Sequence, residues 1–178
     1  MEGKMVMETM DKNEQREILK KYLGQYCRNK NKKEALKRRL GNIMYEMLGA
    51  KSVKYSSVPK SITNSIGNAP LDFVIKCEEI EERIKTQQKE MPATMLKVLD
   101  ILDFLDTGSV EREILEYKYL DGDSWEKISK LSALSRTQCI LYWNRGIDRL
   151  LEFKSVSETM KEYDKKLQKF ESPYSTVH

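Results

Sequence analysis

Apolar residues recur at helical spacing along most of this chain, and this periodicity is the feature that most constrains its fold. One run of apolar residues begins at Leu36 and another at Phe73, each with alternating steps of three and four residues. Such steps place a single apolar stripe along each helix. The members are Leu36, Leu40, Ile43 and Met47 in the first run, and Phe73, Cys77, Ile80, Ile84, Gln87 and Met91 in the second. We predict an all-α fold in which these helices pair as a helical hairpin or coiled coil, within one chain or between two.

The 178 residues divide into five regions by composition and periodicity. We assign 1–50 as a basic N-terminal helical region, 51–70 as a polar linker containing Ser and Pro, 71–92 as a charged heptad helix, 93–153 as a helical domain, and 154–178 as a C-terminal helix and tail. Polar loops as long as the linker are uncommon inside compact domains and tend to be functional or mobile.

Several helix boundaries can be predicted from local signals. We expect a first helix over about 11–26 and a stop at Gly49, while 28–33 is a turn or a continuation of the helix. Pro92 is expected to end the heptad helix or to start its successor. Residues 93–105 are apolar on several faces, so we expect them to form a central core element.

The residue inventory argues against most enzyme chemistry and against metal sites. The three cysteines are far apart and have no zinc spacing, and the only histidine is the last residue, His178. We expect Cys77 and Cys139 to be buried on apolar stripes. The sequence therefore predicts a protein that is not an enzyme and binds no metal or cofactor. Neither a membrane-spanning run nor a secretion signal is visible, so we expect a cytoplasmic protein.

The net charge of +4 is distributed unevenly. Residues 1–51 carry 13 Lys and Arg against 7 Asp and Glu, whereas residues 93–153 carry 8 against 11. The densest positive stretch, from Arg28 to Arg39, suits an anionic partner, with nucleic acid first, although a solvated helix face produces the same pattern. The candidates for auxiliary phosphate contacts are Lys32, Lys33, Lys37, Arg38 and Arg39.

A short helix, a tight turn and a longer helix are predicted between residues 124 and 151. Ser124 caps the short helix, 131–134 forms the turn, and Ser135 caps the long helix. Ser109 starts an earlier helix that ends in a turn at 120–123. This order is the helix-turn-helix layout. The inward positions of the long helix are expected to be Cys139, Tyr142, Gly146, Ile147 and Leu150.

Three stretches resemble the promoter-reading module of bacterial sigma factors that is called region 4. They are Glu111 to Leu120, Ser124 to Ile128 with Trp125 and Glu126, and Leu134 to Gln138 with Ser135 and Arg136. The resemblance covers Ser109 to Phe153, and it implies that 93–153 is a sigma region 4-like helix-turn-helix domain. The chain lacks a segment before Ser109 like the one with which full sigma factors melt DNA.

The order of a basic helix, a linker with Tyr55 to Pro59, a charged helix and a sigma-like module is similar to phage and prophage late-gene regulators of the ArpU and RinA type. This resemblance implies a transcriptional regulator in the cytoplasm of a bacterial host. It would bind double-stranded DNA, contact host RNA polymerase and form a homodimer.

By analogy with the module, the helix that begins at Ser135 enters the major groove. Arg136 would pair with guanine and Gln138 with adenine, while Leu141 would touch a thymine methyl or the backbone. The predicted DNA-binding set is Ser135, Arg136, Thr137, Gln138, Leu141, Arg145, Lys127 and Lys130. Arg149 is a further phosphate candidate, or a solvated charge like Arg145.

Ile140, Leu141 and Trp143 stand where this module usually carries polar residues. We expect Trp143 to pack within the protein, with the helix over 154–170 as its partner. Two other functions are open. One is a protein-binding adaptor of RNA polymerase that uses the three apolar side chains and no specific DNA. The other is a DNA-packaging component like a terminase small subunit.

Overall fold

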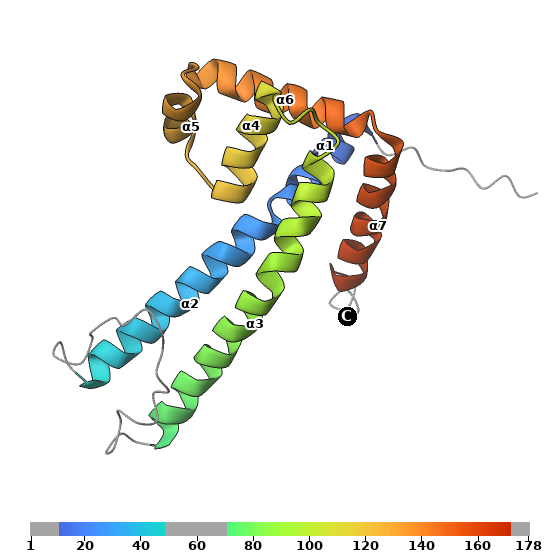
Figure 1. Ribbon diagram of the computed structural model, residues 1–178. Helices are drawn as coiled ribbons and strands as arrows, with labels where there is room; N and C mark the ends of the chain where they lie inside the picture. The colour runs from blue at the N-terminus through green and yellow to red at the C-terminus, as the bar shows by residue number, and fades with distance from the viewer. Residues whose placement is uncertain (1–10, 49–70, 172–178) are drawn as a thin grey trace, which may run out of the picture. The chain divides into compact units, whose positions relative to one another are not determined.

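The computed structural model describes residues 11–48 and 71–171, and within these ranges the chain forms helices and no strand (Figure 1). The expected stop at Gly49, the linker at 51–70 and the end of the tail from 172 lie outside the described residues. The helices are α1 Lys12–Leu23, α2 Gln25–Leu48, α3 Leu71–Leu102, α4 Val110–Glu116, the π-helix η3 Tyr117–Asp121, α5 Trp125–Ser132, α6 Arg136–Leu151 and α7 Lys154–Glu171. The all-α prediction is confirmed for this part of the chain. None of these helices has the length and apolar content needed to cross a membrane.

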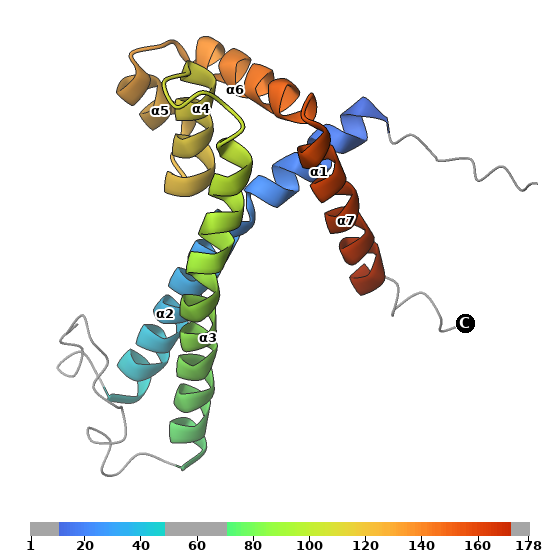
Figure 2. The ribbon, with the colours of Figure 1, turned by 45° about the vertical axis from the view of Figure 1, so that its right-hand side comes forward.

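The chain divides into two compact units, one of residues 28–94 and the other of residues 11–27 together with 95–171. The first unit, the hairpin unit, consists of α2 and α3 lying side by side in antiparallel directions (Figures 1 and 2). Leu36, Phe73, Cys77 and Ile84 are buried along this pair. Leu40, Ile43, Met44 and Val74 pack around Phe73 and Cys77.

The two predicted apolar stripes are therefore confirmed in most of their members. Met47 is the exception, because its side chain is 49% exposed and Met44 contacts the core instead. At the other end of the pair, the Asn29 side-chain amide donates a hydrogen bond to Thr94 Oγ1 at 3.3 Å. The buried Cys77 and Cys139 also agree with the sequence-based expectation.

Residues 28–33 continue α2 without a turn, which is one of the two predicted alternatives, because Lys, Arg and Asn are tolerated on an exposed helix and no Gly or Pro interrupts them. The break lies earlier, at Gly24, whose N–H reaches Lys20 O at 3.0 Å.

The prediction that Pro92 ends a helix or starts the next one is wrong, since α3 runs through it to Leu102. Cys77, Ile84, Met91 and Val98 follow one another at steps of seven, so the apolar stripe keeps one phase on both sides of the proline. Pro92 itself is exposed, where its ring meets no core neighbour. Continued burial of the stripe outweighs the hydrogen bond that proline removes.

The second unit has its core where α1, the end of α3, α6 and α7 meet. Leu19, Leu23, Val98, Leu102, Ile147 and Leu150 are fully buried there. Helix α7 packs on α1 (Figure 2). The rings of Tyr22 and Tyr163 meet there edge to face, with centroids 5.1 Å apart. The expectation that 93–105 forms a core element is confirmed for Val98, Ile101, Leu102 and Leu105, whereas Leu96 is 60% exposed.

Glu81 lies beside the buried Cys77 in the hairpin unit, and its Oε1 atom is buried without a hydrogen-bond partner in the described structure. Burial is the main cause that raises the pKa of the Glu81 carboxyl above its ordinary value of 4.5. The folded state therefore disfavours the charged form. The folded state is therefore most stable, with respect to this group, at low pH, where the Glu81 carboxyl is protonated. It loses stability as the pH rises through the folded-state pKa of Glu81.

Replacing Glu81 by Gln is expected to raise the free energy of unfolding at pH 7, because the uncompensated charge is removed. The advantage should shrink as the pH falls toward 4, where the wild-type carboxyl is protonated. Urea unfolding of the full chain at both pH values measures this. Glu46→Gln, an exposed change on α2, is the control and should show little pH-dependent difference. Equal behaviour of the two variants would refute the burial argument.

Candidate nucleic-acid interface

The predicted order of a short helix, a turn and a longer helix is observed as α5, a turn and α6 (Figure 1). Ser124 caps α5 by accepting a hydrogen bond from Lys127 N, and Ser129 Oγ donates to Leu134 O across the turn. Ala133 ends α5 in the left-handed region with φ 56°. Local hydrogen bonds thus close both sides of the turn. Ser135 caps α6 as predicted, but Leu131 and Ser132 of the predicted turn at 131–134 belong to α5, so the turn begins at Ala133.

An apolar cluster holds α4, α5 and α6 together. Ile114, Ile128 and Cys139 are fully buried, one from each helix, and Trp125 and Tyr142 pack around them. The predicted inward stripe of α6 is confirmed for Cys139, Gly146, Ile147 and Leu150, while Tyr142 is half-buried.

Gly146 marks the point where α6 crosses α4 closely. A Cβ atom at this position would lie 2.8 Å from Leu115 Cδ1 and 3.2 Å from Glu111 Cβ. Only a residue without a side chain allows this crossing at its present distance. The orientation of α6 on α4 therefore depends on this glycine.

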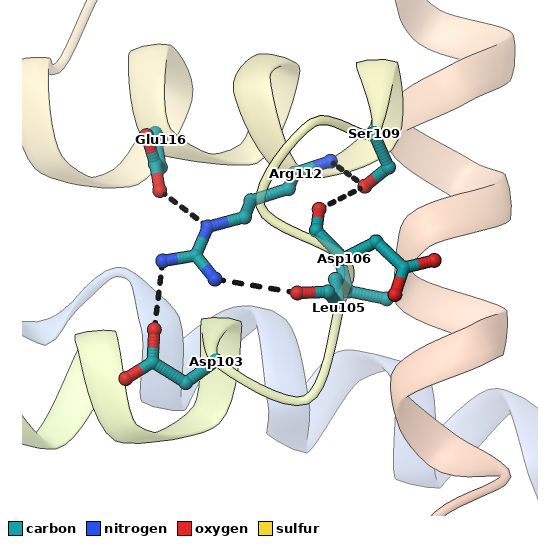
Figure 3. A network of polar contacts seen from close by, with 6 residues as sticks. All are labelled: Asp103, Leu105, Asp106, Ser109, Arg112 and Glu116. Carbon is teal, nitrogen blue, oxygen red and sulfur yellow. Dashed lines mark hydrogen bonds and ion pairs between the residues drawn. The ribbon is translucent and has the colours of Figure 1, made fainter.

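Arg112 fixes the connection between α3 and α4 (Figure 3). Its guanidinium lies 2.7 Å from Asp103 Oδ1 and 2.8 Å from Glu116 Oε1, and it donates to Leu105 O at 3.2 Å. Ser109 Oγ accepts from Arg112 N and donates to Asp106 O, which caps α4 as predicted. The hydrogen bond with Glu116 is the main cause that raises the pKa of Arg112, so the guanidinium stays charged.

The first turn of α6 is exposed and polar. Arg136, Thr137 and Gln138 are exposed, and the Leu141 side chain is 63% exposed one turn further on. Lys130, on α5, is exposed as well, and neither Lys130 nor Arg136 forms an ion pair with a described residue. The predicted base-reading side chains thus share the solvent-facing start of one helix.

Gln138 has a structural role that the sequence analysis did not assign. Its side-chain Oε1 accepts a hydrogen bond from Ser135 N at 2.9 Å, while Ser135 Oγ accepts from Gln138 N at 3.2 Å. These two bonds form a capping box. The oxygen of Gln138 is therefore occupied, and a two-bond contact with adenine would require opening the cap.

Arg145 and Arg149 do not extend freely from α6, because both face the carboxylate of Glu111 on α4. Arg145 Nε lies 3.2 Å and Arg149 Nη1 3.8 Å from Glu111 Oε1, and Arg149 Nη2 lies 3.9 Å from Asp106 Oδ2. The Glu111 side chain is only 9% exposed. Sequence reasoning missed this acidic partner, which precedes Arg145 by more than thirty residues and carries no motif.

The remaining predicted basic residues lie in different environments. Lys127 pairs with Asp123 at 2.8 Å, and this hydrogen bond raises the pKa of Lys127. Lys33 and Lys37 lie 3.4 and 3.5 Å from Glu34. The auxiliary set of Lys32, Lys33, Lys37, Arg38 and Arg39 belongs to the hairpin unit, whereas all residues of the predicted DNA-binding set from Lys127 to Arg145 belong to the other unit.

Trp143 contacts two helices that we did not expect. Its ring meets Trp125 on α5 edge to face at 5.7 Å between centroids, and Lys20 Nζ on α1 lies 4.8 Å from its centroid. We expected α7 as its partner. Next to it, Arg16 on α1 donates to Asn144 Oδ1 at 3.2 Å and lies 3.3 Å from Asp148 Oδ1. Side chains of α1 thus contact α6 at Trp143, Asn144 and Asp148.

We find no protein family whose sequence pattern matches this chain, and no curated protein or solved structure with significant similarity to it. The geometry of the α5–turn–α6 unit and its side chains is therefore the basis for a functional interpretation.

Arg112→Ala is expected to lower the free energy of unfolding by about 1–3 kcal/mol, because Leu105 O loses its donor and the α3–α4 connection loses both ion pairs. Arg112→Lys, which keeps the charge but not the forked geometry, should fall between Ala and wild type. Urea unfolding of the full chain measures the difference. Lys130→Ala, at an exposed site, is the control, and a loss no larger than the control's would contradict this role.

Gln138→Ala is expected to cost about 0.5–2 kcal/mol by opening the capping box, whereas Gln138→Glu should keep the wild-type stability. A carboxylate accepts the same bond from Ser135 N, and its charge is favourable at a helix N-terminus. Thermal unfolding of both variants measures this. Identical melting of the Ala and Glu variants would show that the cap contributes nothing.

Proposed function

We propose that this chain is a sequence-specific DNA-binding transcriptional regulator of the phage late-gene activator type, acting in a bacterial cytoplasm without a cofactor or enzymatic activity. It binds promoter DNA with α6 and contacts RNA polymerase. The observation that carries the proposal is the capped, exposed and polar start of α6 on a helix-turn-helix. The resemblance of Ser109 to Phe153 to sigma region 4 supports the same function.

The geometry of α6 fits major-groove binding. An α-helix with its side chains is about 10–12 Å across, which suits a groove about 12 Å wide, and the sixteen residues of α6 give a length of about 24 Å along it. The N–H groups of Arg136 and Thr137 and the Ser135 hydroxyl face a phosphate in this proposal, and Lys127 and Lys130 on α5 supply nearby positive charge. Arg136 then reaches the two acceptors of guanine.

The occupied oxygen of Gln138 changes the expected readout. While the capping box is closed, only the side-chain NH₂ of Gln138 is available, so it donates a single hydrogen bond to a base acceptor. Leu141 supplies an apolar contact for a thymine methyl. In this proposal, Arg136 is the main source of base discrimination.

Electrostatic attraction from one copy of the module is expected to be weak. Residues 93–153 carry 8 Lys and Arg against 11 Asp and Glu, and Glu111 neutralises part of the charge of Arg145 and Arg149. Affinity therefore depends on a second copy, on the basic residues of α2 or on RNA polymerase. Two copies would place their recognition helices about 34–36 Å apart, one turn of DNA.

The test begins with selection of bound genomic fragments by the purified chain, followed by mobility-shift titration of the enriched site. Arg136→Ala is expected to weaken specific binding by about 5–150-fold, the loss of one two-bond base contact. Gln138→Glu should also weaken binding while keeping the fold, because it removes the donor and places a charge near phosphate.

Lys161→Ala, an exposed charge removal on α7, is the control for the mobility-shift titration. The proposal is overturned if no fragment is enriched, or if Arg136→Ala binds the enriched site as well as Lys161→Ala does.

A second candidate, a polymerase adaptor without specific DNA binding, is favoured by one observation. Leu131 on α5 and Leu141 on α6 are 50% and 63% exposed. Large apolar side chains in such positions are typical of protein interfaces. Added salt separates the two functions, because DNA binding weakens steeply with salt and an apolar interface does not.

A further inference from the structure

A groove of about 730 Å³ runs between α2 and α3 in the hairpin unit. Lys32, Leu36 and Arg39 line it from α2, and Glu79, Glu82 and Gln87 line it from α3. Only Leu36 and Gln87 are buried among these six, so the groove has a closed floor and charged rims.

The buried Gln87 side chain lacks one hydrogen bond. It is 8% exposed, its Nε2 reaches only Glu90 Oε2 at 3.4 Å, and its Oε1 has no donor within the described structure. A buried acceptor without a donor destabilises the folded state. A single polar residue at a heptad seam position also commonly specifies the oligomeric state of paired helices. A hydrogen-bond donor from a molecule bound in the groove would satisfy Gln87 Oε1.

The two rims carry opposite charge. The α2 rim has Lys32 and Arg39, whereas the α3 rim has the carboxylates of Glu79 and Glu82, with Arg83 beside them. The helices as a whole follow the same division. From residue 28 to 48 there are 7 Lys and Arg against 2 Glu, and from 71 to 94 there are 4 Lys and Arg against 6 Asp and Glu.

No ion pair joins the two rims within one copy in the described part of the chain. The pairing of Glu82 is with Lys85 at 3.7 Å, on its own helix. The opposite charges therefore remain available to a molecule that enters the groove.

Apolar side chains extend this surface along α3. Ile75 and Leu71 precede Glu79 by four and eight residues, so they lie on the same side of the helix. They are 45% and 74% exposed. A surface that combines exposed apolar residues, a buried unpaired acceptor and two charged rims is typical of a protein interface rather than of a solvated helix face.

We propose that this groove is the interface of a two-fold symmetric homodimer, in which the α2–α3 hairpins of two copies form a four-helix bundle. A two-fold interface needs a self-complementary surface, where residue i meets j and j meets i. A second copy turned by half a revolution brings the α2 rim of each chain to the α3 rim of its partner. Both charge contacts are then favourable, and the partner's polar side chains reach Gln87 Oε1.

Other occupants fit the charges less well. Nucleic acid or an acidic peptide would meet Glu79 and Glu82, and a basic peptide would meet Lys32 and Arg39. Only a partner with both signs in the inverse order satisfies both rims, and a second copy of this chain has that order. The proposal does not depend on DNA binding.

The test uses two charge-reversed variants of the full chain, K32E/R39E and E79K/E82K. Light scattering coupled to size-exclusion chromatography should report a dimer for wild type and a monomer for each variant alone, because both contacts become repulsive in either homodimer. An equimolar mixture should recover the dimer mass. In the heterodimer, the reversed rims face each other and both contacts are attractive again.

Recovery on mixing separates an interface from an effect within one chain, since no intrachain defect is repaired by a second variant. Circular dichroism checks that each variant keeps its helix content. Should either variant unfold, the quadruple variant K32E/R39E/E79K/E82K, with both rims exchanged, still tests the proposal and should be a dimer. K37E/R38E, the same charge change on α2 outside the groove described above, is the control and should stay dimeric.

Three results would overturn the proposal. They are a wild-type chain that is monomeric from micromolar to near-millimolar concentration, charge-reversed variants that remain dimeric, and a mixture of the variants that remains monomeric while both are folded.

Discussion

The close crossing of α4 and α6 at Gly146 is the contact on which the helix-turn-helix unit depends. A side chain at this position would collide with Leu115 and Glu111, so the absence of a Cβ allows the two helices to approach. The approach buries Ile114 and Cys139 around Ile128 of α5. Once this stripe of α6 is buried, its opposite side, which carries Gln138, Leu141 and Arg145, is left to solvent, whereas Arg136 is exposed at the N-terminal end of the helix.

Polar interactions then tune what the exposed side of α6 can offer. The buried Glu111 attracts Arg145 and Arg149, and the capping box occupies the oxygen of Gln138. Each of these side chains has a structural partner in the free protein. In the proposed DNA complex such partners would have to be exchanged for phosphates or bases, whereas Arg136 has no such partner among the described residues to give up. The hairpin groove also carries charges without such partners. Among the described residues, Lys32 and Arg39 on α2 form no ion pair with Glu79 or Glu82 on α3 within one copy.

Local signals predicted much of this structure. The caps at Ser109, Ser124 and Ser135 were predictable because an N-cap hydrogen bond involves residues only three positions apart. The apolar stripes of α2 and α3 were predictable from their period. Pro92 shows the limit of local reasoning, since a residue that commonly breaks helices lies inside α3. The phase of the stripe, which spans seven-residue steps on both sides, had more weight than one missing hydrogen bond.

The amino-acid sequence by itself determined the helices, their caps, their buried stripes and the exposed start of α6, because these depend on side chains within one or two turns of each other. The tertiary structure alone decided which distant groups meet. Glu111 reaches Arg145 and Arg149, Arg16 reaches Asp148, and Trp143 meets Trp125 on α5 and Lys20 on α1. A charged or aromatic side chain has many possible partners of suitable chemistry in a chain that is 34% charged. Only the packing of the helices selects among them, since it sets the distances on which ion pairs and ring contacts depend.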